Sequence, residues 1–302
     1  MTSPTARITV YGEALVDLVP AAAEPLAPLT PALGGGPFNV ARALGRLGAD
    51  VAFQSRLSDD AFGRALRESL AADGVDLSHC GQGPEPTTLA VASLDPNGAA
   101  AYTFYVDGTA DRLAEPEPIT EGFAVFGTLS LALEPASLRY AAAARRSAEA
   151  GAVVCLDPNV RPAFASEKHR LFLRGMLESV TLLKLSDEEI EFLGDTSHVP
   201  VVVTTLGGNG IGVRAPFGTV EVAAPAVKVA DTIGAGDTVM AALVYQLAAR
   251  GLDRNGVAAL CEDEWREILD FAARAAAITV SRTGAQPPYL RELGAGSAPC
   301  VT

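Results

Sequence analysis

The sequence predicts an α/β protein with a mainly parallel central sheet. Short apolar runs bounded by turn residues alternate with longer helical patterns along most of the chain, as they do in βαβ units. The 302 residues are 49% hydrophobic and 20% charged, which is enough apolar material for a large buried core. Two glycine-rich segments each open a helix, and such helix starts offer free backbone N–H groups to a ligand.

The expected strands are short apolar runs that end at turn or polar residues. They lie at 7–12, 51–57, 124–131, 152–157, 180–186 and 199–208. The expected helices are longer, carry apolar residues at helical spacing, and include alanine-rich segments suited to close packing on a sheet. They lie at 38–47, 62–72, 137–151, 167–179, 187–194 and from about 236 to a C-terminal cap at Gly251.

Two segments interrupt this alternation. Residues 21–33 are rich in proline and alanine, and residues 87–106 form two alternating strand patterns joined by an Asp-Pro-Asn-Gly turn at 95–98. A hairpin inside a βαβ series has to lie off the main sheet. We expect a small β appendage that could close over a site, with a plain edge hairpin as the alternative.

Charge and cysteine content exclude several classes of function. The net charge is −13, and the basic residues are scattered, which argues against nucleic acid or an anionic membrane as a partner. No apolar segment approaches the length of a membrane span and no signal peptide is evident, so we expect a cytoplasmic protein. The cysteines are too far apart to indicate a zinc site or a disulfide framework: Cys80, Cys155, Cys261 and Cys300.

The segment "DTIGAGD", 231–237, places three small residues and a carboxylate at the start of a helix. The N–H groups of Gly234, Ala235 and Gly236 lack intrahelical partners, and the helix dipole adds positive charge, so an anion could bind there. Asp237 could accept a proton from a substrate hydroxyl beside that anion. The alternative is an ordinary aspartate that favours a helix start.

The segment "GGGPFNVARALGRLG", 34–48, opens a second helix. Pro37 suits the first helical position, an apolar stripe follows, and Gly48 suits the end of the helix. Asn39 lies in the first turn, where it could contact a ligand or serve as a local capping group.

These two segments resemble the C-terminal and N-terminal signatures of the ribokinase-like (PfkB) carbohydrate kinase family. The resemblance extends from 10 to 286, with the motifs in the family's order. It implies one ribokinase-like domain over 1–302, a three-layer α/β/α fold with a central mainly parallel sheet. It also implies a small β lid built from about 14–33 and 86–110, and lids that could pair in a homodimer.

The resemblance implies a role for particular residues. Asp237 would be the catalytic base, with an anion hole at Gly234, Ala235 and Gly236. Substrate contacts would come from Asp17, Gly34, Gly35, Asn39, Phe104 and Arg161. Nucleotide contacts would come from Lys184, Ser186, Thr205, Gly207 and Gly210. Mg²⁺ would be reached through water by Glu189, and a monovalent cation such as K⁺ would bind at Asp231, Ile233 and Gly284.

The implied activity is transfer of a phosphoryl group from ATP to a primary hydroxyl of a small sugar. Three segments, 102–113, 126–135 and 280–288, are most similar to fructokinases, with ribokinases next. Ribose, 2-keto-3-deoxygluconate and nucleosides stay open as acceptors, because specificity depends on a few pocket contacts. The alternative from a different class of function is a protein that binds sugar or nucleotide without catalysing a reaction.

Overall fold

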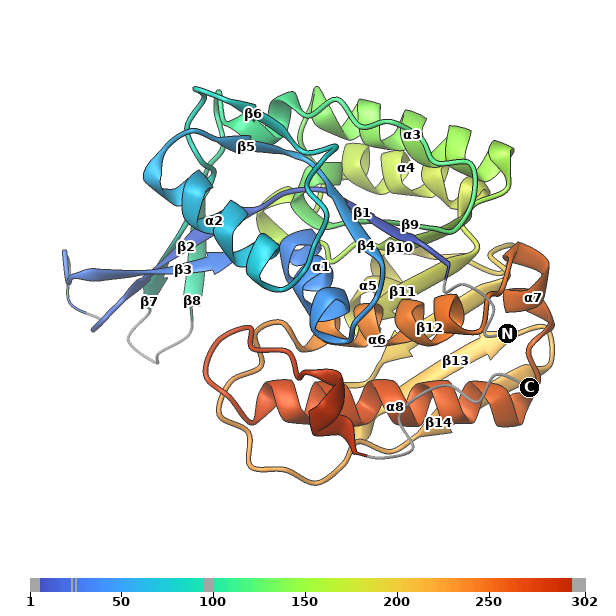
Figure 1. Cartoon of the computed structure of the whole chain (residues 1–302). Coiled ribbons are helices and arrows are strands. Elements are labelled where there is room, and N and C mark those ends of the chain that lie inside the picture. Colours follow the sequence, from blue (N-terminus) through green and yellow to red (C-terminus); the bar gives the residue numbers. More distant parts are fainter. Residues whose placement is uncertain (1–5, 23, 25, 95–99, 295–302) are drawn as a thin grey trace.

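The computed structural model describes residues 6–22, 24, 26–94 and 100–294. Within them, eight strands form one central sheet (Figure 1). In spatial order they are β14 (Gly218–Val222), β13 (Ile211–Ala215), β12 (Val201–Thr205), β11 (Leu182–Ser186), β10 (Val153–Asp157), β9 (Phe123–Gly127), β1 (Ile8–Tyr11) and β4 (Val51–Gln54). Neighbours from β4 to β12 are parallel, and β13 and β14 add an antiparallel edge. The expected α/β class is therefore confirmed.

Helices cover both faces of this sheet, and each face has its own apolar cluster. One layer consists of α1 (Gly36–Arg46), α2 (Ala61–Ala72), α6 (Ala235–Ala249), α7 (Arg254–Ala259) and α8 (Glu262–Val280). The other consists of α3 (Ala136–Ala150), α4 (Glu167–Met176) and α5 (Asp187–Leu193). In Figure 1, α3 and α4 lie on one side of the strands, and α6 and α8 lie on the other.

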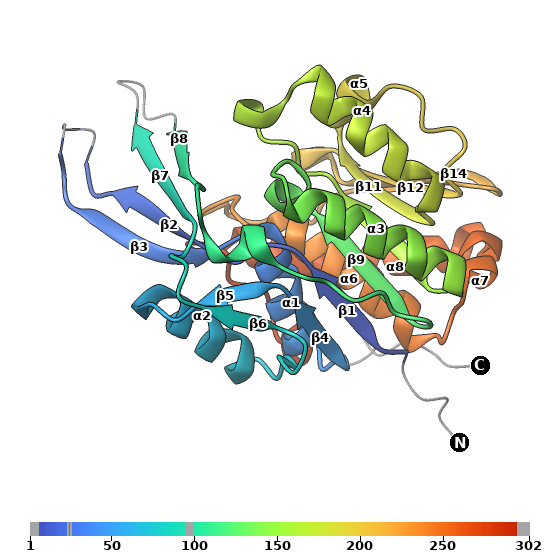
Figure 2. The same ribbon diagram turned by 90° about the horizontal axis from the view of Figure 1, so that it is seen from above.

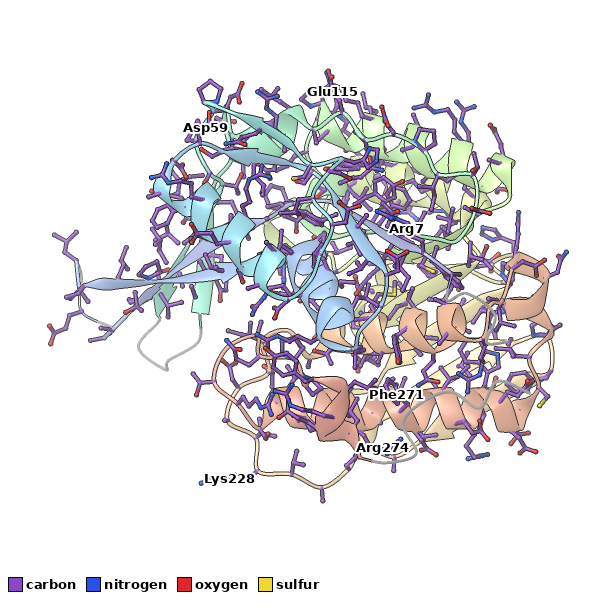
Figure 3. The ribbon with its side chains drawn as sticks, in the orientation of Figure 1. Arg7, Asp59, Glu115, Lys228, Phe271 and Arg274 are labelled. Carbon is purple, nitrogen blue, oxygen red and sulfur yellow. The ribbon has the colours of Figure 1, made fainter. Side chains whose placement is uncertain are left out.

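Helix α6 is buried along most of its length. Its residues are buried on all sides from Val239 to Ala248 and are apolar except Gln246, as expected for a helix enclosed by a sheet and by other helices. Phe271 of α8, labelled in Figure 3, stacks on Tyr245 of α6 with ring centroids 5.8 Å apart. This contact packs the C-terminal half of α6 against α8.

A second sheet projects from the edge of the α/β body, as Figure 2 shows. Its order is β3 (Leu29–Gly34), β2 (Leu15–Pro20), β7 (Leu89–Leu94) and β8 (Ala100–Tyr105). The turn expected at 95–98 lies outside the described residues. Strand β3 arises within the proline-rich segment, and it tolerates Pro31 because it is an edge strand that needs fewer backbone donors.

Several boundaries differ from the sequence-based expectation. The strand expected at 124–131 ends at Gly127, because Thr128 turns the chain with φ of 63° and a 3₁₀ turn follows. The segment expected as one strand at 51–57 is divided into β4 and β5 (Arg56–Ser58), and β5 pairs with β6 (Gly81–Gly83). In the part of the chain that the structure describes, no helix has the length and apolar character needed to span a bilayer.

Candidate active site

The predicted residues gather at the carboxyl ends of the parallel strands, where open α/β sheets bind their ligands. Asp157 ends β10, Ser186 ends β11 and Thr205 ends β12. The N-termini of α1 and α6 point to the same edge, and a small pocket there is lined by Gly36, Thr128, Asp157 and Asp237, together with apolar residues of β1 and β9. The topology thus brings together motifs that are far apart in the sequence.

Asp237 is buried in the first turn of α6, with 6% of its surface exposed. Asn39 Nδ2 donates a hydrogen bond of 2.9 Å to Asp237 Oδ2, which joins the two glycine-rich motifs. A Cβ on Gly36 would overlap Thr128 Cγ2 and would lie 3.3 Å from Asp237 Oδ1, so only glycine fits between these two side chains. Desolvation and the charge of Asp157 raise the pKa of Asp237 to about 7, against the opposing effects of Asn39, Lys184 and Arg161.

The start of α6 lies one residue earlier than the sequence indicated. Gly234 caps the helix with φ of 76° and ψ of 3°, and no side chain caps it. The N–H of Ala235 donates a long hydrogen bond of 3.3 Å to the Thr232 carbonyl. The N–H of Gly236 belongs to the first turn, where a helix has no carbonyl four residues back to accept it.

A buried ion pair lies beside this helix start. Lys184 Nζ is 2.7 Å from Asp157 Oδ2, and both side chains are 5% exposed. A Cβ on Gly236 would be 3.4 Å from Lys184 Nζ. Burial disfavours the charge on Lys184, but Asp157, Glu189 and Asp237 outweigh that effect and raise its pKa.

Asp157 was not among the residues that sequence reasoning assigned to the site. Its carboxyl is buried, its pKa is raised mainly by desolvation, and its Oδ1 has no hydrogen-bond partner among the described residues. The available signal was a single aspartate at the end of the apolar strand pattern 152–157, a position where parallel sheets place functional groups.

The predicted sugar-contacting residues come from the second sheet and from the α/β body. Desolvation raises the pKa of Asp17 on β2 to about 6, and Arg161 opposes the shift. Arg161 is exposed after β10 and also lowers the pKa of Asp237, so its charge acts on both carboxyls. A Cβ on Gly34 would overlap Asp17 Oδ2, and Gly35 is the N-cap residue of α1 with φ of 104°.

Phe104 faces inward from β8 and is half-buried. Its ring centroid lies 5.3 Å from that of Phe164 and 6.2 Å from that of Tyr102. Phe164 belongs to the 3₁₀ turn that follows Arg161. These aromatic contacts connect the second sheet with the segment that carries the arginine.

Ser186 and Glu189 are joined in a capping box at the start of α5. Glu189 Oε2 accepts hydrogen bonds of 2.9 Å from both the N–H and the hydroxyl of Ser186, and Oε1 accepts one of 2.8 Å from the Val160 N–H. Glu189 therefore ties α5 to the segment after β10. The Ser-x-x-Glu spacing is typical of a capping box, but the bond to Val160 was not evident from the sequence.

The remaining predicted nucleotide residues lie around the end of β12. Thr205 donates a hydrogen bond of 3.3 Å from its hydroxyl to the Leu185 carbonyl. Gly207 has open space around it and a φ of 56°. Gly210 has a φ of 121°, and a Cβ there would overlap the Val222 carbonyl. A side chain at 210 would therefore disturb the turn between β12 and β13.

The three residues predicted for a monovalent cation are close together. The Asp231 carboxylate accepts hydrogen bonds of 3.0 Å from the Ile233 N–H and 2.9 Å from the Gly284 N–H. Among the described residues, no group of three His, Cys, Asp or Glu side chains is arranged to hold a metal. Cys80, Cys155 and Cys261 are free thiols, and Cys300 lies outside the described residues.

Comparison with known proteins shows similarity over almost the whole chain. The model described as "pfkB family carbohydrate kinase" matches residues 5–292. A fructokinase from Rhizobium leguminosarum bv. trifolii is 35% identical over 283 residues, covering 86% of this chain and 85% of that protein. A fructokinase from Xylella fastidiosa, solved with bound ATP, has a TM-score of 0.85 and 26% identity, covering 96% of this chain and 97% of the other. A fructokinase double mutant from Vibrio cholerae O395, solved with fructose, ADP and potassium ion, has a TM-score of 0.81 and 27% identity, covering 96% and 97%.

Proposed function

This chain belongs to the pfkB family of carbohydrate kinases and is a sugar kinase; on that premise, we propose that it transfers the γ-phosphoryl group of ATP to a primary hydroxyl of fructose. The observation that carries the proposal is the buried Asp237 carboxyl, held by Asn39 beside the N-terminus of α6 and near the Lys184 ammonium. The fructokinases among its relatives support fructose as the acceptor.

Asp237 is suited to act as the general base. Its Oδ2 accepts the hydrogen bond from Asn39, which leaves Oδ1 to accept the proton of the sugar hydroxyl. The sugar oxygen then forms a bond to the γ-phosphorus, the bond from that phosphorus to the β–γ bridging oxygen breaks, and ADP leaves with the electron pair. With a pKa of about 7, the carboxyl can both take the proton and release it near neutral pH.

The charge that develops on the transferred group would be stabilised by the N–H groups at the start of α6 and by Lys184. When bound, Mg²⁺ would neutralise charge on the nucleotide phosphates. Glu189 fits an indirect role, because its oxygens already accept three hydrogen bonds and would reach the ion through water. Ser186, Thr205, Gly207 and Gly210 would line the nucleotide side of the site.

A K⁺ ion would bind through backbone carbonyls near Asp231, Ile233 and Gly284. The two hydrogen bonds to the Asp231 carboxylate hold these segments together just before the helix start. The Vibrio cholerae relative was solved with a potassium ion, which supports K⁺ as a ligand of this chain. A cation there would add positive charge close to the anion-binding end of α6.

The second sheet would act as a lid over the sugar. Asp17 and Phe104 lie on its strands, while Arg161 and Phe164 lie on the facing segment of the α/β body. Closure would exclude water, which otherwise competes with the sugar as phosphoryl acceptor.

Substitution of Gly34 by Ala should weaken sugar binding selectively. The new methyl group would displace the Asp17 carboxylate, which we expect to align sugar hydroxyls. We expect the KM for fructose to rise about tenfold or more, with the KM for ATP changed by less than about twofold, because only polar contacts to the sugar are lost. Steady-state kinetics in both substrates measures this. Gly175→Ala is the control, since a Cβ at 175 meets nothing within 4 Å; an unchanged fructose KM in Gly34→Ala would contradict the assignment.

An assay of ADP release over fructose, ribose, 2-keto-3-deoxygluconate and adenosine tests the function. We expect the highest kcat/KM for fructose, by about tenfold or more over the next acceptor. A higher value for another acceptor would reassign the substrate within the family. Sugar binding without turnover of any acceptor would instead indicate a sensing protein.

A further inference from the structure

The ion pair between Asp157 and Lys184 is placed where a purely structural pair would be unfavourable. Lys184 Nζ lies against the first turn of α6, next to the position of a Cβ on Gly236. The N-terminus of a helix carries partial positive charge, so an ammonium there is repelled unless anions surround it. Burying both charges also carries a desolvation cost. Both the repulsion from the helix N-terminus and the desolvation of the two charges lower the stability of the fold. An ion pair retained in spite of both effects points to a functional requirement.

Three carboxylates act on this single ammonium. Asp157 contacts it directly at 2.7 Å, and the charges of Glu189 and Asp237 also act on it. Asp157 Oδ1 has no hydrogen-bond partner among the described residues, and Asp157 and Asp237 line the same pocket. If Asp157 were neutral, Lys184 could pair with Asp237, because Glu189 is held by its hydrogen bonds from Ser186 and Val160.

We propose that Asp157 is a positioning residue for phosphoryl transfer: it holds the Lys184 ammonium at the first turn of α6 and thereby prevents Lys184 from forming an ion pair with Asp237. Lys184 then faces the transferred phosphoryl group, and Asp237 stays available to take the proton of the acceptor hydroxyl. This inference rests on the proposed kinase function, and it assigns to Asp157 a role that acts through two other residues.

The groups that face Asp237 come from three directions. Asp157 ends β10, Lys184 lies in β11, and Arg161 follows β10, while Asn39 reaches Asp237 from α1. Of these, Asp157 raises the pKa of Asp237, and Lys184, Arg161 and Asn39 lower it. Loss of the Asp157 charge should therefore lower the pKa of Asp237 directly, and movement of Lys184 toward Asp237 should lower it further.

The test is Asp157→Asn, which keeps the shape of the side chain and removes its charge. In ligand-free protein with ¹³C-labelled aspartate, NMR titration should show the Asp237 pKa lower than in wild type by about one unit or more, with the signal assigned through Asp237→Asn. Lys184→Met should raise that pKa. In kinetics, Asp157→Asn should lower kcat by about tenfold or more and move the acid limb of kcat/KM to lower pH, with the fructose KM changed by less than about threefold.

Asp73→Asn is the matched control. Asp73 forms buried ion pairs with Arg42 and Arg46 at 2.8 and 3.0 Å, and it is not among the groups that shift the pKa of Asp237. This variant should lower thermal stability without moving the Asp237 titration or the acid limb. If Asp157→Asn behaves in the same way, the Asp157–Lys184 pair is structural and the inference is wrong. The NMR titration needs no turnover, so failure to phosphorylate any sugar would contradict the proposed function while the titration still decides the role of Asp157.

Discussion

Replacing Asp237 by Asn should lower kcat by about a hundredfold or more, while the dissociation constant for fructose changes by less than about threefold. Asparagine keeps the size of the side chain and an oxygen that can accept the hydrogen bond from Asn39 Nδ2. It cannot take a proton from the sugar hydroxyl, and loss of a general base costs about a hundredfold to ten-thousandfold. Single-turnover kinetics and calorimetric titration of fructose measure the two effects. Retention of more than about a tenth of the wild-type kcat would defeat the assignment of the base.

The same variant should be more stable than the wild type at alkaline pH. The folded protein raises the pKa of Asp237 from 3.8 to about 7, so the folded state binds this proton more tightly than the unfolded state does. The stabilising effect of the bound proton is complete below about pH 4 and is lost as the pH rises through 7. Asn at 237 avoids that loss, so its melting temperature should exceed that of the wild type at pH 8 but not at pH 4. This result would show that low activity does not reflect unfolding.

Gly236→Val should also nearly abolish phosphoryl transfer, through a different cause. A branched side chain at the first turn of α6 would occupy the space beside Lys184 Nζ, which lies 3.4 Å from the Cβ position. The transferred group could then no longer approach the backbone N–H groups. Removal of a single donor of this kind costs about a hundredfold to a thousandfold in kcat. We expect a loss in kcat of at least about a hundredfold and a higher KM for ATP.

The control for this change is Gly175→Val, at an exposed helical position with open space around it. This variant places the same valine in a helix, with the same effect on helix stability, at a position that does not contact the candidate active site. Sugar binding should persist in Gly236→Val, because Asp17 and Asn39 are unchanged. Near-normal turnover in this variant would show that the phosphates bind away from α6.

Local sequence patterns were sufficient for most of the fold. Apolar periodicity predicted the parallel strands and the helices between them, and glycine-rich starts predicted the N-termini of α1 and α6 to within one or two residues. Apolar periodicity did not predict the structure at two places where the backbone departs from the usual preference of the residue. Thr128 ends a strand with a left-handed conformation, and Pro31 lies in a strand that only its edge position permits.

Long-range contacts explain the less predictable part of the site. Asn39 and Asp237 are 198 residues apart, and only the strand order of the sheet brings them within 2.9 Å of each other. Glu189 was expected to reach a metal ion through water, but its Oε1 also accepts a hydrogen bond from the Val160 N–H, 29 residues away, which no local motif indicates. Asp157 was overlooked because its importance comes from Lys184, which belongs to the neighbouring strand.

The sequence by itself determined the fold class and the two helix starts with their Asn and Asp, because hydrophobic periodicity and glycine placement act over a few residues. Only the tertiary structure decided the pKa values of the ionisable groups in the candidate active site. It set Asp157, Lys184 and Asp237 in one buried region, and the pKa of a buried carboxyl depends on its desolvation and on the charges around it, whatever their position in the chain.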